Sequence, residues 1–102
     1  MKFKVLTNQK WLLWAQGMVI YPFVIIRPRV CSETLFRHEL EHCYQIQREG
    51  VIKFYLSYVW KLIRHTGYKN HPDEVEAYQA QNKKLTKVER QWYESGVIEL
   101  ND

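Results

Sequence analysis

Residues 32–50 read SETLFRHELEHCYQIQREG, and this stretch predicts the helix around which the rest of the fold is arranged. Ser32 can cap its first turn, Glu33 suits the positive end of the helix dipole, and Gly50 is typical of the position just past a helix end. The apolar positions recur at three- and four-residue steps, at Leu35, Phe36, Leu40, Cys43 and Ile46. We therefore expect an amphipathic helix with one face in the core.

The residues before this helix read as strands. Phe3–Leu6 is a short apolar run, and Met18–Tyr21 and Phe23–Arg27 are β-branched and aromatic runs on either side of Pro22. A proline within such a run is confined to an edge strand or a kink. We expect a small, twisted N-terminal antiparallel sheet with an exposed edge strand.

The residues after Gly50 read as further helices. One is expected from Val51 to about His65, and another from Pro72 to about Leu85, because proline is favoured in a first helical turn. Thr86 can cap a final short helix that ends near Ser95. The chain of 102 residues shows no repeat or linker, so we expect one α+β domain over residues 1–102, with the sheet packed on three to four helices.

The composition excludes several classes of protein. Hydrophobic residues make up 46% of the chain and charged residues 25%, with only 4 glycines and 3 prolines, which excludes a disordered tail or a collagen-like rod. The net charge of +4 comes from scattered lysines and arginines, without a long basic run or a nucleic-acid-binding signature. We expect no nucleic-acid partner.

The cysteines and the N-terminus indicate a cytoplasmic protein. Cys31 and Cys43 are too few for a disulfide scaffold and do not form a CxxC pair, so we expect two reduced thiols, with Cys43 in the core. The first ten residues are too charged for a signal peptide. The longest uncharged stretch, Trp11–Ile26, is shorter than the roughly 20 residues of a spanning helix.

The residues with the clearest chemistry are His-Glu-Leu-Glu-His at positions 38–42, an HExxH pattern inside the first predicted helix. His38 and His42 lie one turn apart on one helical face, so both imidazoles can bind a single Zn²⁺ at about 2 Å. The carboxylate of Glu39 lies beside such a metal and can take a proton from a zinc-bound water. The alternative is a solvated polar face that happens to carry two histidines.

A hydrolytic zinc site normally has a third protein ligand. The downstream candidates are His65, His71, Asp73, Glu74 and Glu76. At about 100° per residue the two glutamates point in opposite directions, so only one faces inward. Helical phase places Glu74 with Tyr78 and Leu85 on the apolar face. The water-facing side would hold Glu76, Gln79 and Lys83. Glu74 is therefore either a metal ligand or a residue that folds back to cap its own helix.

Residues 38–42 together with Pro72-Asp73-Glu74-Val75-Glu76-Ala77-Tyr78 resemble the gluzincin type of zinc metallopeptidase. In that type a glutamate on a later helix, often in an ExxA context, is the third ligand, and Glu74 stands in its place. Tyr78 stands where many families have an aspartate. The resemblance covers about residues 18–80 and extends to small uncharacterised bacterial and phage proteins of a minimal gluzincin type.

The resemblance implies a zincin-like fold in which the edge strand borders a zinc cleft. An extended peptide substrate would then add itself as a strand to that edge, at Met18–Tyr21 or Phe23–Arg27. An edge strand that pairs with nothing is the alternative. His71 and Tyr78 are candidates to stabilise the oxyanion, as are His65 and Tyr68, against the alternative that these are surface residues without a role.

The sequence thus predicts a zinc-dependent metallopeptidase in which His38, His42 and Glu74 hold Zn²⁺ and Glu39 activates water. The first alternative is a latent scaffold that binds zinc or a peptide without cleaving it, because so small a domain lacks a second lobe to wall the cleft. The second is a membrane-surface module that uses the aromatic helix after Val51 and the Trp11–Ile26 stretch. The substrate and the oligomeric state are left open.

Overall fold

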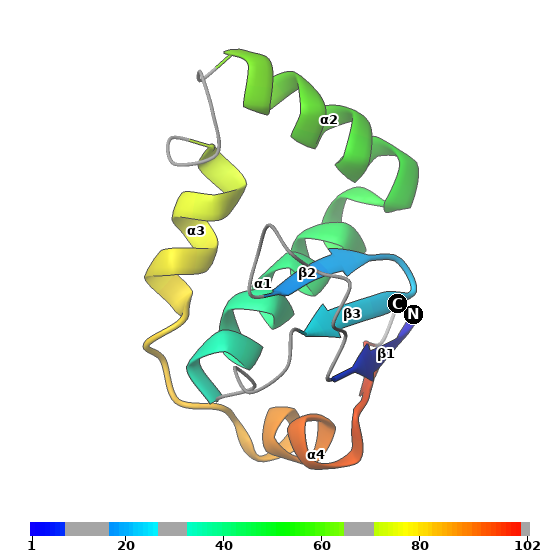
Figure 1. Cartoon of the computed structure of the whole chain (residues 1–102), viewed down its shortest axis with the longest axis vertical. Coiled ribbons are helices and arrows are strands. Elements are labelled where there is room, and N and C mark those ends of the chain that lie inside the picture. Colours follow the sequence, from blue (N-terminus) through cyan, green and yellow to red (C-terminus); the bar gives the residue numbers. More distant parts are fainter. Residues whose placement is uncertain (8–16, 27–32, 65–70, 101–102) are drawn as a thin grey trace.

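The described part of the chain forms a small mixed sheet and four helices (Figure 1). The computed structural model describes residues 1–7, 17–26, 33–64 and 71–100. The strands are β1 (Lys2–Leu6), β2 (Gly17–Ile20), β3 (Phe23–Ile26) and β4 (Val97–Glu99). The helices are α1 (Glu33–Glu49), α2 (Val51–Arg64), α3 (Pro72–Ala80) and α4 (Lys87–Ser95). The predicted α+β class is confirmed.

The strand order β2-β3-β1-β4 leaves β2 at one edge of the sheet, as predicted. β2 and β3 form an antiparallel hairpin, but β3 pairs with β1 in parallel, with Val5 opposite Val24. The prediction of an entirely antiparallel sheet is therefore wrong for this pair. The hairpin places its returning strand next to β1, and that strand runs in the same direction as β1.

β4 is a three-residue strand that the sequence analysis did not identify. It pairs antiparallel with β1, with Ile98 opposite Phe3, and both of these side chains are fully buried. Three residues are too few to show the alternation by which a strand is recognised. β4 therefore extends the sheet with residues from the C-terminal end of the described chain.

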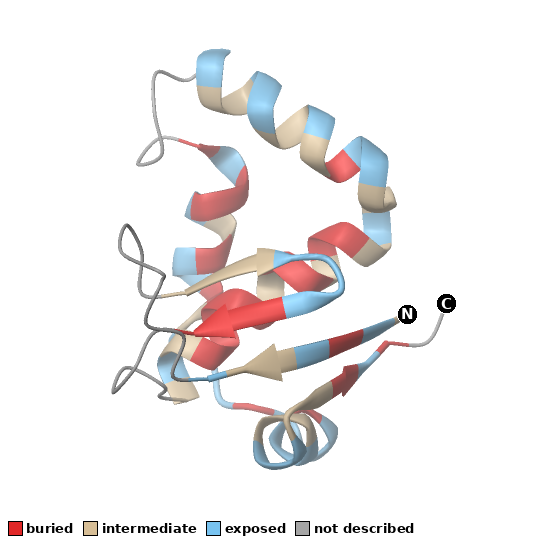
Figure 2. Ribbon diagram, turned by 45° about the vertical axis from the view of Figure 1, so that its right-hand side comes forward, coloured by how far each residue is buried: buried red, intermediate tan, exposed pale blue. Residues whose placement is uncertain are grey.

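α1 is buried on two sides, which explains how it serves both the core and a polar site (Figure 2). Its apolar face packs into the hydrophobic core with the sheet, as the periodicity predicted, through Phe36, Leu40, Cys43 and Ile46. Its second buried face is polar and carries Arg37, His38, Glu39, His42 and Gln45. Polar groups are buried at such density only where they find partners, which come here largely from α3.

Two predicted helix caps are confirmed and one predicted helix end is wrong, while Ser32, the predicted cap of α1, lies outside the described residues. Gly50 separates α1 from α2 with a positive φ of 88°, and Thr86 caps α4 in a capping box with Glu89. α3, however, ends at Ala80 rather than near Leu85, because the chain turns over residues 81–83. Leu85 still reaches the core, but from the connection that precedes α4.

Candidate metal centre

Three predicted ligands meet between α1 and α3. Glu74 is the third residue of α3, and its Oε1 lies within hydrogen-bond distance of Nε2 of His38, at 3.2 Å, and of Nε2 of His42, at 3.1 Å. One ligand atom from each residue lies within 4.8 Å of the others, and all three side chains are buried. This buried His-His-Glu group could hold a metal ion and is consistent with an HExxH-type site.

Each histidine is oriented from its other ring nitrogen by an amide oxygen. Nδ1 of His38 donates to Oε1 of Gln81 at 3.0 Å, and Nδ1 of His42 donates to Oε1 of Gln45 at 2.8 Å. Gln45 also donates to the backbone carbonyl of Asp73 at 3.0 Å, which ties α1 to the start of α3. Partners of this kind fix the tautomer and direct Nε2 at a metal. The donor set therefore fits a divalent cation.

The charges of His42 and Glu74 shift each other's pKa. Burial alone lowers the pKa of His42, but its hydrogen bond to Glu74 and the charges of Glu39 and Glu74 outweigh burial and raise that pKa to about 9. Burial alone raises the pKa of Glu74, but the hydrogen bonds from His38, His42 and Tyr58 hold it well below its ordinary value. The protein thus stabilises a carboxylate here and a positive charge beside it.

Glu39 lies next to the group but is not part of it. Its carboxylate is buried, and its Oε2 has no hydrogen-bond partner among the described residues. Burial raises the pKa of Glu39, and the positive charges of His42 and His38 counteract part of that rise. A buried carboxylate oxygen without a partner is costly, and water or a substrate in the neighbouring pocket is what can satisfy it.

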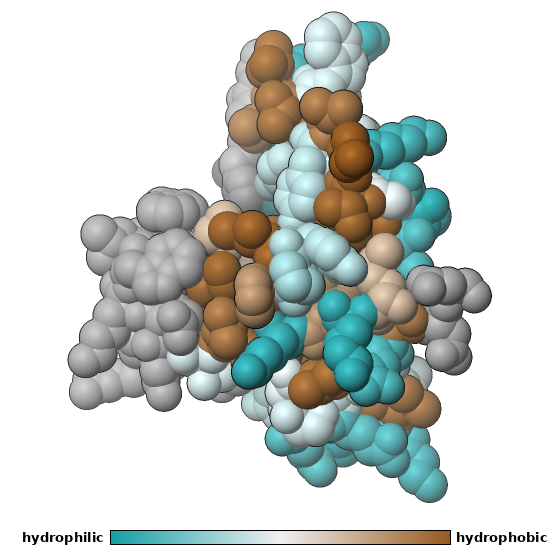
Figure 3. Space-filling view, turned by 90° about the vertical axis from the view of Figure 1, so that its right-hand side faces the viewer, coloured by the Kyte–Doolittle hydropathy of each residue, from teal (hydrophilic) through white to brown (hydrophobic). Residues whose placement is uncertain are grey.

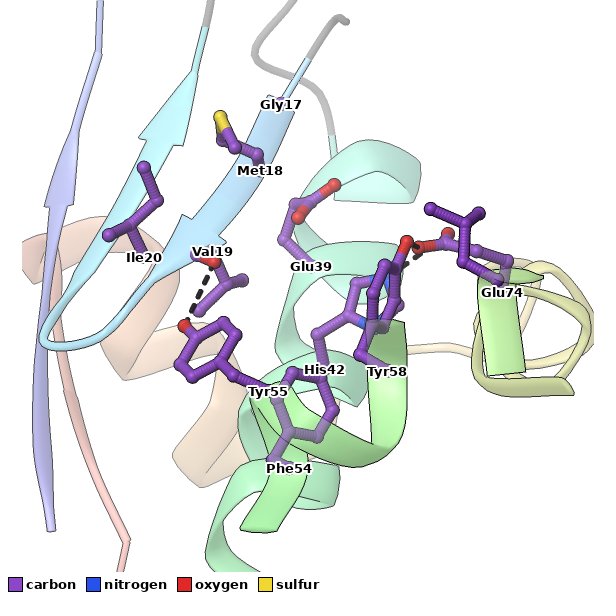
Figure 4. A pocket seen from close by; sticks show the side chains of 11 residues that line it. Gly17, Met18, Val19, Ile20, Glu39, His42, Phe54, Tyr55, Tyr58 and Glu74 are labelled. Atoms are coloured by element: carbon purple, nitrogen blue, oxygen red, sulfur yellow. Dashed lines mark hydrogen bonds and ion pairs between the residues drawn. The ribbon is translucent and has the colours of Figure 1, made fainter. Parts of the chain in front are cut away.

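The pocket has a volume of about 420 Å³ and opens between β2, α1 and α2 (Figure 4). Glu39, His42 and Glu74 supply its polar lining, while β2 and the inner face of α2 supply mostly apolar residues. Gly17 of β2 borders Glu39 so closely that a Cβ there would lie 3.3 Å from Oε1 of Glu39. The predicted edge strand therefore does border the candidate site.

Tyr58 of α2 is a site residue that the sequence analysis did not single out for this role. Its hydroxyl donates to Oε2 of Glu74 at 2.6 Å, which leaves Oε1 of Glu74 to face the two imidazoles. Burial and the neighbouring Glu74 carboxylate raise the pKa of Tyr58, so it remains a donor. The sequence carried no signal for this contact, because Tyr58 and Glu74 lie on different helices and meet only when α2 and α3 pack together.

Two of the four predicted oxyanion candidates, His71 and Tyr78, lie apart from the pocket lining. His71 is fully buried and caps α3: its Nδ1 accepts from the backbone N–H of Asp73, and its Nε2 donates to the backbone carbonyl of Tyr58. Tyr78 is half exposed, and its ring packs edge-on against His38 with 4.7 Å between centroids. His65 and Tyr68 lie outside the described residues.

Glu76 takes a different position from the one predicted. It is only partly exposed, and its Oε1 accepts from Gln45 and Arg48, each at 3.1 Å, so it binds α1 rather than only water. The helix-capping alternative for Glu74 does not apply either, since His71 provides the cap. Of the two glutamates, Glu74 is the one in the buried group.

Comparison with known protein families, curated proteins and solved structures finds no match. No described helix is both long and apolar enough to cross a membrane.

Proposed function

We propose that this protein is a zinc-dependent metallopeptidase of the gluzincin type. The observation that carries the proposal is the convergence of His38, His42 and Glu74 beside a second buried carboxylate, Glu39, with an unsatisfied oxygen. Two imidazoles and one carboxylate are a common ligand set of hydrolytic zinc sites. We also propose that the protein acts in the cytoplasm, where the buried thiol of Cys43 stays reduced. Cys31 lies outside the described residues.

In this proposal each residue of the site has a separate role. Zn²⁺ held by His38, His42 and Glu74 would acidify water and polarise a peptide carbonyl. Glu39 accepts a proton from the attacking water and passes it to the leaving amine, and its raised pKa makes it a stronger base than an exposed carboxylate. Tyr58 fixes the rotation of the Glu74 carboxylate through its short hydrogen bond.

The substrate we propose is a peptide in extended conformation, laid along the outer edge of β2. The carbonyl of Val19 points away from β3, because it accepts from the hydroxyl of Tyr55 on α2. Backbone groups two residues apart point to the same side of a strand, so those of Gly17 face the same edge, next to Glu39. A peptide added here would pass close to Glu39.

The deciding experiment replaces Glu39 by glutamine. Glu39→Gln should bind zinc as the parent does but lose hydrolysis of an unfolded protein substrate by a factor of about 100 or more, because an amide cannot accept the proton. Glu33→Gln is the matched control, since Glu33 lies on the same helix in a surface ion pair with Arg90. Undiminished hydrolysis by Glu39→Gln would refute the assignment of Glu39 as the base.

A latent scaffold that holds metal without cleaving peptides is the second candidate, and one contact favours it. The hydroxyl of Tyr55 already donates to the carbonyl of Val19 at 3.1 Å and accepts from the backbone N–H of Tyr21 at 2.8 Å. Tyr55 thus occupies edge groups of β2 that an added strand would use. Stoichiometric zinc binding, with no hydrolysis by either the parent or Tyr55→Phe, would favour this scaffold over the peptidase.

A further inference from the structure

α2 is apolar on two opposite faces, and only one of them is covered. Its inner face contributes Phe54, Tyr55 and Tyr58 to the core and the pocket. Its outer face carries five exposed side chains, here called the outer stripe: Ile52, Leu56, Val59, Trp60 and Ile63, each between 54% and 77% exposed. Apolar surface gathers along the upper part of the molecule, where α2 lies (Figure 3).

The spacing of the outer stripe makes it a continuous surface. Ile52, Leu56, Val59 and Ile63 follow one another at steps of four, three and four residues, which places them on one side of the helix, and Trp60 adjoins them. Scattered exposed apolar residues are ordinary, but a contiguous row along a whole helix marks an interaction surface. The charges beside the row indicate what it binds.

The border of the outer stripe is basic. α2 contains three basic residues and no acidic one. Lys53 and Arg64 are exposed and, at about 100° per residue, lie just beyond Trp60 around the helix. Lys61 lies on another side, where it pairs with Asp73 at 3.0 Å. An apolar stripe with a tryptophan and a cationic border complements an anionic lipid surface.

We propose that α2 docks on an anionic membrane surface, with the outer stripe in the interface and Lys53 and Arg64 at the lipid phosphates. The helix would lie in the plane of the surface. Because the pocket lies on the inner side of α2, docking leaves it uncovered. This inference is independent of the metal centre and of any peptidase activity.

A second copy of the chain fits the outer stripe less well. Pairing α2 with itself would bring Lys53 and Arg64 of both copies close together, and α2 holds no acidic residue to pair with them.

The test is co-sedimentation of the full chain with vesicles of phosphatidylglycerol and phosphatidylcholine, compared with vesicles of phosphatidylcholine alone. We expect binding to the anionic vesicles that weakens at high salt. The double variant Leu56→Ser/Ile63→Ser should bind at least about tenfold more weakly, and Lys53→Gln/Arg64→Gln about tenfold or more. Val88→Ser, at an exposed apolar residue of α4, is the matched control and should bind as the parent does.

Circular dichroism of each variant checks that the fold is retained, which we expect because the replaced side chains are exposed. Three results would overturn the proposal: no sedimentation with anionic vesicles, equal sedimentation with neutral ones, or parent-like binding by the Leu56→Ser/Ile63→Ser variant. A dimer in solution that Leu56→Ser/Ile63→Ser dissociates would overturn it in favour of a second copy.

Discussion

Removing one hydroxyl group tests whether α2 helps to build the metal centre. Tyr58→Phe deletes the 2.6 Å hydrogen bond to Oε2 of Glu74 and keeps the ring, which packs against His71 with 3.9 Å between centroids. A hydrogen bond to a charged group contributes about 1.5–3 kcal/mol. Tyr58 is only partly buried, so we expect a loss near 1.5 kcal/mol in the free energy of unfolding of the metal-free protein.

The effect on zinc should be of similar size. Without Tyr58 the carboxylate of Glu74 is free to rotate, and losing such an outer partner typically weakens metal affinity about 10- to 100-fold. We expect the lower end of that range, which corresponds to about 1.4 kcal/mol. Competition with a chromogenic chelator measures the zinc affinity, and urea unfolding with excess chelator measures the stability.

Tyr55→Phe is the matched control, because it removes the same group from the same helix. Its hydroxyl contacts Val19 and Tyr21 on the sheet and does not reach Glu74. This variant should keep the parent's zinc affinity. An unchanged zinc affinity in Tyr58→Phe, or an equal loss in both variants, would refute the role assigned to Tyr58.

Three further predictions concern the same site. Glu74→Ala should weaken zinc binding at least about tenfold in a paired titration in which Glu76→Ala changes it little, and the reverse order would contradict the ligand assignment. Gly17→Ala should lower kcat for peptide hydrolysis at unchanged zinc affinity, because its Cβ would displace the Glu39 carboxylate; an unaffected kcat argues that Glu39 has room to spare. In excess chelator, the pKa of His42 near 9, against 6.5 unfolded, contributes stability that is present below pH 6.5 and lost as the pH rises through 9. This loss is at most about 3 kcal/mol. Urea unfolding between pH 6.5 and 9 measures it, and a free energy of unfolding that stays level or rises with pH would contradict the prediction.

The sequence alone determined the parts of the protein that depend on local periodicity. The three- and four-residue steps from Phe36 to Ile46 predicted α1 and its core face. The four-residue spacing of His38 and His42 placed both imidazoles on one side of that helix, since a helix turns by a fixed angle per residue. The capping box at Thr86 and the helix-ending glycine at position 50 were predictable for the same local reason.

Contacts between distant segments were decided only by the tertiary structure. Helical phase favoured Glu74 over Glu76, but it relied in part on Leu85, which lies beyond the end of α3. What places Glu74 is its contact with two imidazoles on α1, 32 and 36 residues away in the chain.

The same is true of Tyr58, of the amide oxygen of Gln81, and of the parallel pairing of β1 with β3. Each depends on how two elements pack, and the residue pattern of one element does not indicate which other element it will contact. The sequence therefore determined which residues could bind a metal, whereas the packing of α1, α2 and α3 decided which of them meet and how their charges are held.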